Sequence, residues 1–357
     1  MENQIKETTF GGNIFIFYAF DVGDDIDFEK LEKTQPVIIR PYSPPKFFKN
    51  YETFLNIELP HPHATSNCFS SKLLRFGVFS LIYKIPFSET LTDLQELLVE
   101  VDQKYQEQSV IDAFSLYKKI KPGIVSPHFF HLRANYTVIQ TNPLQGQDAK
   151  SFKEQYGNNI ASLLRFETKN LSSAQRNEIL ESASGYYRGD LVVIDTEASF
   201  ISDPEYDEMI EIFEFANIQQ LELQYYDQVL TKKLNVIYES RLPNIPWSNY
   251  LPFVNTHHNA TLELGRLRAD ISVVTEQLQS SIRLTGDPYL LGIYQMLFES
   301  LDLKGWQDSI SKKLDIIKDV REIYENQVTS IREDMLSVLV IVLILIEVIL
   351  GLFNYFK

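Results

Sequence analysis

The six histidines of this sequence occur in three close pairs, at His61 and His63, His128 and His131, and His257 and His258. Two imidazoles on one helix face could bind a transition metal, and a single imidazole could act as a general acid or base. No cysteine cluster and no HExxH pattern accompanies the pairs, and Pro62 and Pro127 indicate turns beside them. We therefore expect these histidines to bind no metal ion, and we expect no cofactor.

Two carboxylates, Asp195 and Glu197, follow the short apolar stretch DLVVID. Carboxylates at the end of a strand can perform acid–base or metal chemistry. An enzyme site near Asp195, or near His128 and His131, is therefore one hypothesis for this chain. Cys68 is the single cysteine, and because it has no recognisable nucleophile context we interpret it as a small buried residue.

A strongly acidic stretch follows, in which residues 190–231 contain eleven Asp and Glu but no Lys or Arg. The acids are Asp190, Asp195, Glu197, Asp203, Glu205, Asp207, Glu208, Glu211, Glu214, Glu222 and Asp227. Such a face could bind a basic protein or divalent cations. The alternative interpretation is a solvated helix face, with acids favoured near the positive end of the helix dipole.

The last candidate residue is Glu347, which lies near the middle of the apolar stretch LSVLVIVLILIEVILGLFNYF at residues 336–356. As a helix, this stretch spans roughly 31 Å at about 1.5 Å per residue, close to the hydrocarbon thickness of a bilayer. Its Leu, Ile, Val and Phe residues favour insertion by several kcal/mol, whereas a charged Glu costs about 3 kcal/mol. The stretch therefore predicts one membrane-spanning helix. Within it, Glu347 could bind a partner helix or could be a tolerated, protonated side chain.

The flanks of this helix predict its orientation. Lys304, Lys312, Lys313, Lys318, Arg321 and Arg332 precede it, and only Lys357 follows it. By the positive-inside rule, the bulk of the chain is cytoplasmic, and the layout is tail-anchored. We expect a single-pass protein of the inner or cytoplasmic membrane, with membrane lipid as one partner.

Mixed secondary structure is predicted for residues 1–198. β-branched and aromatic residues predict strands at 13–20, 36–42, 53–59, 73–85, 135–140 and 190–195. Apolar residues at helical spacing predict helices at 90–105, 148–168 and 172–187. Because these elements interleave without a strict β-α-β order, we expect an α+β domain.

Long helices are predicted for residues 199–334. Ser202-Asp203-Pro204-Glu205 is typical of a helix start, and nothing interrupts the pattern before about Arg241. A proline-containing link follows at 242–252. Further helices are expected at 261–284 and at 288–300 with Asp287 as cap. The last begins near Trp306, and its apolar residues recur at roughly seven-residue spacing, which favours helix–helix packing or a coiled coil.

Composition restricts the function classes. A formal net charge of −15 repels phosphate backbones, so we expect no nucleic-acid partner. One cysteine allows no intramolecular disulfide, which is typical of a reducing compartment. The first residues show no basic region followed by an apolar one, so we expect no secretory signal.

Two stretches resemble the required-for-meiotic-nuclear-division-1-like family. Its C-terminal pattern, L-E-W-I-I-x-x-L-I-x-x-E, is similar to residues 336–347, with Leu343, Ile344 and Glu347 in register. Its upstream pattern, y-L-E-I-x-x-R-v-x-v-L-N-x-R-L-d, is similar to residues 221–234. Ser337, Val338, Tyr226 and Thr231 depart from the family residues Glu, Trp, Arg and Asn. The resemblance implies a membrane-anchored, oligomeric protein without established catalysis.

These observations divide the chain into an α+β cytoplasmic domain at 1–198, a helical hairpin or coiled-coil stalk at 199–334 and an anchor at 335–357. They lead to two hypotheses for its function. The first is a self-associating scaffold or regulatory protein, a homo-oligomer with no catalytic residue. The second is an enzyme acting at the membrane surface. For the first, we expect contacts between copies or helices at Leu221, Glu222, Ile310, Ile317, Tyr324, Ile331, Leu343, Ile344 and Glu347.

Overall fold

The computed structural model of the chain describes residues 8–23, 25–34, 40–41, 57–59, 61–74, 77–129, 133–143, 148–239 and 287–355. They fall into two compact units. Unit 1 comprises Met1–Tyr225 and Glu276–Trp306, and unit 2 comprises Tyr226–Thr275 and Gln307–Lys357.

A mixed sheet forms the centre of unit 1. Its strand order is β3-β4-β5-β6-β1-β8-β10-β9, and only the β8–β10 pair is parallel. The strands are β1 (Thr9–Asp21), β3 (Arg40–Pro41), β4 (Ile57–Glu58), β5 (Cys68–Leu73), β6 (Val78–Thr90), β8 (Arg133–Thr141), β9 (Leu191–Ile194) and β10 (Ala198–Ser202). A second, two-stranded sheet pairs β2 (Asp25–Ile26) with β7 (Ile124–Val125).

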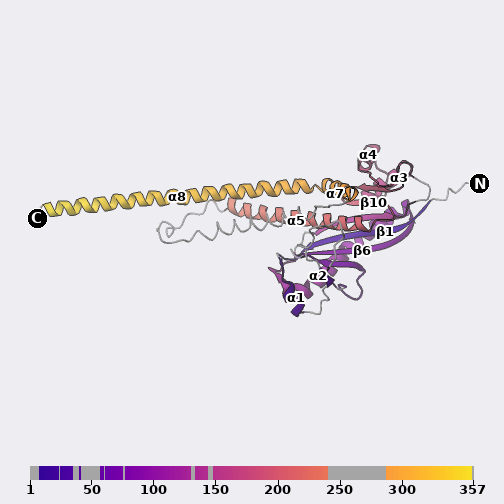
Figure 1. Cartoon of the computed structure of the whole chain (residues 1–357), viewed down its shortest axis with the longest axis horizontal. Helices are drawn as coiled ribbons and strands as arrows, with labels where there is room; N and C mark the ends of the chain where they lie inside the picture. Colours follow the sequence, from indigo (N-terminus) through magenta and orange to yellow (C-terminus); the bar gives the residue numbers. More distant parts are fainter. Residues whose placement is uncertain are drawn as a thin grey trace, which may run out of the picture. The chain divides into compact units, whose positions relative to one another are not determined.

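Helices cover both faces of this sheet, and Figure 1 shows α2 and α5 on opposite sides of β1 and β6. The helices are α1 (Phe28–Thr34), α2 (Leu91–Ile120), α3 (Ala149–Leu164), α4 (Ser173–Glu181), α5 (Asp207–Glu239), α7 (Pro288–Ser300) and α8 (Leu303–Tyr355), with a 3-10 turn at Lys121–Gly123. Both α5 and α8 run from one unit into the other.

Burial on both sides explains the continuous apolar composition of β1. Ile16 and Tyr18 belong to the core cluster shared with α2 and α3. On the other face, Phe15 contacts the ring of Tyr206, and in the adjacent β8 the ring of Tyr136 stacks on Phe213 of α5. The α+β domain expected from the sequence is therefore confirmed.

Several helices start where capping residues predict them. Asp287 accepts a hydrogen bond from the Tyr289 backbone, and Pro288 occupies the first turn of α7, as expected. Thr90 caps α2 by accepting from the Asp93 backbone. However, α2 continues to Ile120, well beyond the predicted end at Tyr105, because its buried stripe continues through Ala113 and Leu116.

Two predicted boundaries are wrong. Residues 73–85 are not one strand, because Gly77 adopts φ 86° in the connection between β5 and β6. The helix expected from Ser202 begins at Asp207 instead. Ser202 pairs with Leu191 at the end of β10, and the Asp203 side chain accepts a hydrogen bond from the Glu205 backbone in the intervening turn. The predicted link at 242–252 and helix at 261–284 lie outside the described residues.

Candidate functional site

Asp112 on α2 is the centre of a buried polar cluster in unit 1. Its side chain is 0% exposed, and its carboxylate accepts hydrogen bonds from Ser66 Oγ and Tyr83 OH, each at 2.7 Å. Gln108 Nε2 donates a third bond at 2.8 Å. Since a buried carboxylate is tolerated only when its oxygens are satisfied, these donors explain how the sequence places an acid in the core.

The imidazole of His63 is a further partner of Asp112. Nε2 lies 2.7 Å from Asp112 Oδ1, and Nδ1 lies 3.0 Å from Thr65 Oγ1. The His63 side chain is 31% exposed. The pair places a buried carboxylate beside a partly exposed imidazole, as is found at the catalytic histidines of many enzymes.

The segment that carries His63 lies along one side of α2. The carbonyl oxygen of Pro62 accepts hydrogen bonds from Ser115 Oγ at 2.9 Å and Lys119 Nζ at 2.7 Å. Asp112, Ser115 and Lys119 recur at helical spacing, so these three residues share one side of α2. The polar stripe therefore holds the loop before β5 in place.

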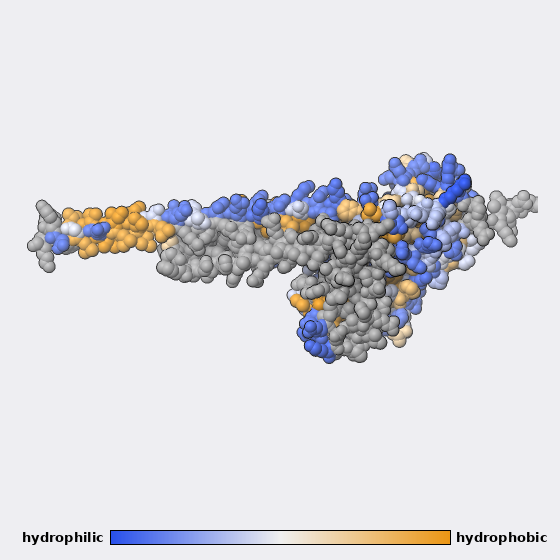
Figure 2. All heavy atoms as spheres, viewed as in Figure 1, coloured by the Kyte–Doolittle hydropathy of each residue, from blue (hydrophilic) through white to orange (hydrophobic). Residues whose placement is uncertain are grey.

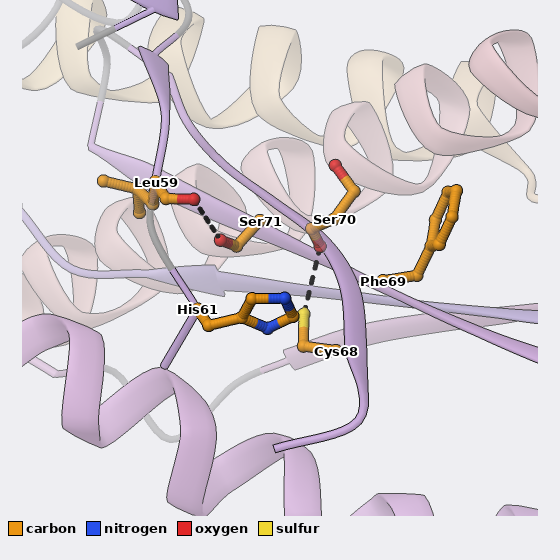
Figure 3. Close-up of a pocket in the computed structure, with 6 residues that line it drawn as sticks. All are labelled: Leu59, His61, Cys68, Phe69, Ser70 and Ser71. Atoms are coloured by element: carbon orange, nitrogen blue, oxygen red, sulfur yellow. Dashed lines mark hydrogen bonds between the residues drawn. The ribbon is translucent and has the colours of Figure 1, made fainter. Parts of the chain in front are cut away.

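A small cavity of about 140 Å³ lies beside this loop, lined by Leu59, His61, Cys68, Phe69, Ser70 and Ser71. Figure 3 shows the His61 ring next to the Cys68 thiol, which donates to the Ser70 carbonyl oxygen at 3.1 Å. Burial, and then the nearby Asp112 carboxylate, raise the pKa of Cys68 to about 12. Such a pKa favours the protonated thiol near neutral pH. Cys68 is 3% exposed, so its interpretation as a buried residue is confirmed.

A second histidine–carboxylate pair lies at the end of β1. His128 Nε2 is 3.2 Å from Asp21 Oδ1, and Asp21 is 1% exposed. The His128 ring stacks on Tyr225 with centroids 5.8 Å apart. His131, its predicted neighbour in a metal site, lies outside the described residues, as do His257 and His258.

Asp195 contacts a residue that the sequence hypothesis did not include. Arg165 Nε lies 2.6 Å from Asp195 Oδ2, and Arg165 Nη2 donates to Oδ1 at 3.0 Å. Burial raises the pKa of Asp195 above its usual range, and the Thr196 backbone and Arg165 offset only part of this shift. Glu197, in contrast, is exposed in the turn between β9 and β10. The carboxylates expected to act together thus have separate environments.

A larger cavity of about 460 Å³ lies between the start of α3 and the segment before β9. Its lining includes Lys150, Lys153, Arg188, Asp148 and Asp190. Lys153 Nζ donates to the Leu180 carbonyl oxygen, and Asp190 accepts from the Tyr187 backbone at 2.8 Å. Across the described part of the chain, no group of three or more His, Cys, Asp or Glu residues is arranged to hold a metal ion.

The acidic stretch does not form one solvated face. Asp190, Asp195, Asp203, Glu214 and Glu222 are buried. Glu214 on α5 accepts hydrogen bonds from Lys72 Nζ on β5 and Ser80 Oγ on β6. The exposed acids at the start of α5 are Asp207 and Glu208, preceded by the exposed Glu205.

The predicted stalk residues occupy two environments. Leu221 and Glu222 are buried in the part of α5 that belongs to unit 1. Ile310 and Ile317 of α8 are buried in unit 2, where Lys313 contacts Asp227 and donates to Thr231 Oγ1 at 2.7 Å. These are helix–helix contacts within one chain. Tyr324 and Ile331 also lie on α8, but their side chains are not among those that the structure describes.

The C-terminal part of α8 carries the predicted anchor residues. Glu333–Leu352 is long and apolar enough to cross a membrane, with a mean hydropathy of 3.0 and 0% of that window buried. Leu343 and Ile344 are more than half exposed, and Glu347 is exposed too. Figure 2 shows the apolar residues gathered over this part of the helix, after a hydrophilic part.

Sequence reasoning missed Asp112, Tyr83, Asp21 and the Lys72–Glu214 pair. Asp112 had a detectable signal, because it follows Tyr105 and Ser109 on the buried stripe of α2, where a charge is unusual. The partners of Asp21 and Glu214 had none, because segments far apart in the sequence supply them.

The family model described as uncharacterized protein MJ0711, N-terminal domain, matches residues 11–208. The uncharacterized protein MJ0711 of Methanocaldococcus jannaschii is 24% identical over 266 residues, which cover 72% of this chain and 79% of that protein. No solved structure matches this chain.

The family match corrects the resemblance drawn from the sequence. It lies in the N-terminal part of the chain, whereas the similarity to the required-for-meiotic-nuclear-division-1-like family was placed at residues 221–234 and 336–347. That family is not confirmed. The positions that match the family patterns in both stretches are mainly apolar residues of helices, which unrelated helices share.

Proposed function

This chain belongs to the family of the MJ0711 N-terminal domain, and we propose that it acts as a membrane-anchored, self-associating scaffold or regulatory protein. In this proposal the α+β domain is cytoplasmic, and α8 runs as the stalk and tail anchor into the inner or cytoplasmic membrane. Membrane lipid and further copies of the chain are its partners.

The observation that carries the proposal is the change of character along α8. Ile310 and Ile317 are buried against protein, whereas the residues of the Glu333–Leu352 window have no protein contact that buries them. Lipid is the solvent that suits such a surface. Lys312, Lys313 and Lys318 precede the window, which supports a cytoplasmic location for the preceding chain.

Self-association is supported by Glu347. It is the single Asp, Glu, Lys or Arg between Leu336 and Phe356. A polar side chain in hydrocarbon is stabilised by a hydrogen-bonding partner on another helix, typically by about 1–2 kcal/mol. We extend the proposal to a coiled-coil contact of the preceding stalk.

The experiment is crosslinking of the full chain in its native membranes with an amine-reactive reagent. We expect oligomers for the wild type, and for Glu347→Leu an association roughly 5- to 30-fold weaker, the equivalent of about 1–2 kcal/mol. Leu345→Ala is the matched control, because it alters a neighbouring exposed side chain and leaves Glu347 intact. Equal oligomer yield from all three proteins contradicts the role of Glu347, and a monomeric wild type contradicts self-association.

A second candidate function is an enzyme at the membrane surface, and the His63–Asp112 pair is the observation that favours it. In this alternative, the partly exposed imidazole of His63 serves as a general acid or base for a bound substrate. His63→Gln then abolishes turnover in a panel of hydrolase and transferase substrates. If no substrate of the panel is turned over by the wild type, the alternative loses its support.

A basic protein is a further proposed partner, at the exposed acids Glu205, Asp207 and Glu208. Attraction between exposed charges falls with ionic strength. We expect the chain to capture a basic partner in low salt. We expect this capture to be lost in high salt and in a variant in which all three acids are replaced by Gln. Capture unaffected by the triple variant contradicts this surface.

A further inference from the structure

A line of exposed positions runs along α8, away from the side that contacts α5. It contains Ile316, Ile323, Ser330, Ser337, Ile344 and Gly351, each seven residues after the one before. Seven residues are about two helical turns, so successive positions lie about 20° apart around a straight helix, and a left-handed supercoil with a partner helix brings all six onto one side. This set is called the α8 line below.

The α8 line is distinct from the side of α8 that packs within the chain. Lys313 contacts Asp227 of α5, and Ile310 and Ile317, on the same side of α8, are buried. Ile316 and Ile323 are 37% and 53% exposed. Ile323 is an apolar residue among mostly polar neighbours in the sequence. Exposed isoleucines at a seven-residue spacing are typical of a helix face that another helix covers.

The continuity of the line restricts what can cover it. Ile316 and Ile323 precede the span of Glu333–Leu352, whereas Ile344 and Gly351 lie within it. Lipid can cover only the second half, and a soluble protein only the first. A second copy of the chain, anchored in the same membrane with the same orientation, presents the same residues at the same depth and can cover both halves.

Polar and small residues in the span fit such a copy. Glu347 and Asn354 lie three residues beyond Ile344 and Gly351, and so beside the line. Ser337 and Gly351 allow close helix approach, and a Cβ at Gly351 would meet no atom within 4 Å. In a two-fold parallel pair, the Glu347 side chains of both copies lie at one depth, where a protonated carboxyl can donate to the other carboxyl group.

We propose that two copies of this chain associate in parallel and in register along the α8 line, from Ile316 in water to Gly351 in the membrane. This inference rests on the proposed self-association and specifies its partner, direction and contact side. Each copy retains its own α5–α8 contact, since the two surfaces lie on different sides of α8.

The test is disulfide crosslinking of the full chain in membranes with Ser330→Cys and Lys318→Cys. Ser330 lies on the line, whereas the exposed Lys318 lies two residues beyond Ile316 and thus faces elsewhere. A disulfide needs Cβ atoms about 3.5–4.5 Å apart, so we expect at least about tenfold more covalent dimer from Ser330→Cys than from Lys318→Cys. Wild type, whose Cys68 is buried, is the background control. Maleimide labelling of both variants verifies that each new thiol is accessible.

The outcomes separate this inference from the proposed function. Preferential dimer from Ser330→Cys, repeated with Ile323→Cys, supports the α8 line. Equal crosslinking of Ser330→Cys and Lys318→Cys, or none from either while amine-reactive crosslinking still gives oligomers, overturns the line and leaves self-association intact. A monomer by every method overturns both.

Discussion

At the scale of single residues, the cluster around Asp112 shows how burial determines chemistry. One carboxylate joins donors from the 61–66 loop, β6 and α2. The same environment suppresses the reactivity of Cys68, because burial and a nearby negative charge both oppose thiolate formation. The residues of this cluster therefore differ in environment: Asp112 is buried and accepts the hydrogen bonds, whereas the His63 side chain is partly exposed to solvent.

We predict that Cys68 reacts very slowly with iodoacetamide in the native protein. Its pKa of about 12 leaves a small thiolate fraction near pH 8, and this fraction rises about tenfold per pH unit below the pKa. Labelling rates measured by mass spectrometry, native against urea-unfolded, check this expectation. Fast native labelling that changes little with pH contradicts it.

We predict that Asp112→Asn destabilises unit 1 by about 2–4 kcal/mol, because several donors lose a charged acceptor in a buried site. Asp102→Asn is the matched control, since Asp102 lies on the same helix and is half-buried, with Gln106 as its side-chain donor at 2.8 Å. The measurement is the urea dependence of Cys68 labelling, which reports on the sheet locally. Equal urea midpoints of Cys68 labelling in the two variants contradict a central role for Asp112.

At the scale of elements, α5 is joined to the sheet by a buried ion pair. Lys72 and Glu214 are 8% and 4% exposed, and Ser80 completes the contact. Removing one member of a buried pair is costly, whereas replacing both by apolar residues is often neutral. The pair thus determines where α5 docks more than it adds net stability.

We predict that Glu214→Gln lowers stability by about 3 kcal/mol, and that Lys72→Met combined with Glu214→Leu recovers most of this loss. Hydrogen exchange of the amides in residues 207–225 is the measurement, with faster exchange expected in the single variant. Glu208→Gln, at an exposed position of the same helix, is the control. A double variant as unstable as the single one contradicts the pairing.

At the scale of the whole molecule, the chain combines a folded α+β unit with a helix that crosses into a second unit and ends in an apolar window. The family match covers most of the first unit and ends at residue 208, close to the start of α5. The window is thus separated in the sequence from the part of the chain that defines the family.

We predict that a chain ending at residue 334 stays soluble after cell lysis, whereas the full chain resists alkaline extraction from membranes. The apolar residues after residue 334, which the shorter chain lacks, favour insertion into the membrane by several kcal/mol. A chain ending at Phe353 retains the Glu333–Leu352 window and is the control, so it should remain in the membrane fraction. Flotation of the 334-residue chain with membranes contradicts the anchor.

Periodicity and composition predicted the elements well where the pattern was long and uninterrupted, as in β1, α7 and the apolar end of α8. They failed where a neighbour in space decided the outcome. Ser202 belongs to β10 because Leu191 and Thr141 pair with it, although its local sequence is typical of a helix cap. Likewise, the polar residues after Tyr105 did not end α2, because the core continues beneath them.

The sequence by itself determined the α+β class and the candidate membrane span, since both depend on runs of neighbouring side chains. The tertiary structure alone decided which charges are buried and with whom they pair. Lys72 and Glu214 are 142 residues apart in the chain, and Ser66 and Asp112 are 46 apart. Their pairing follows from how strands align and helices dock, and a linear pattern carries no information about such distances.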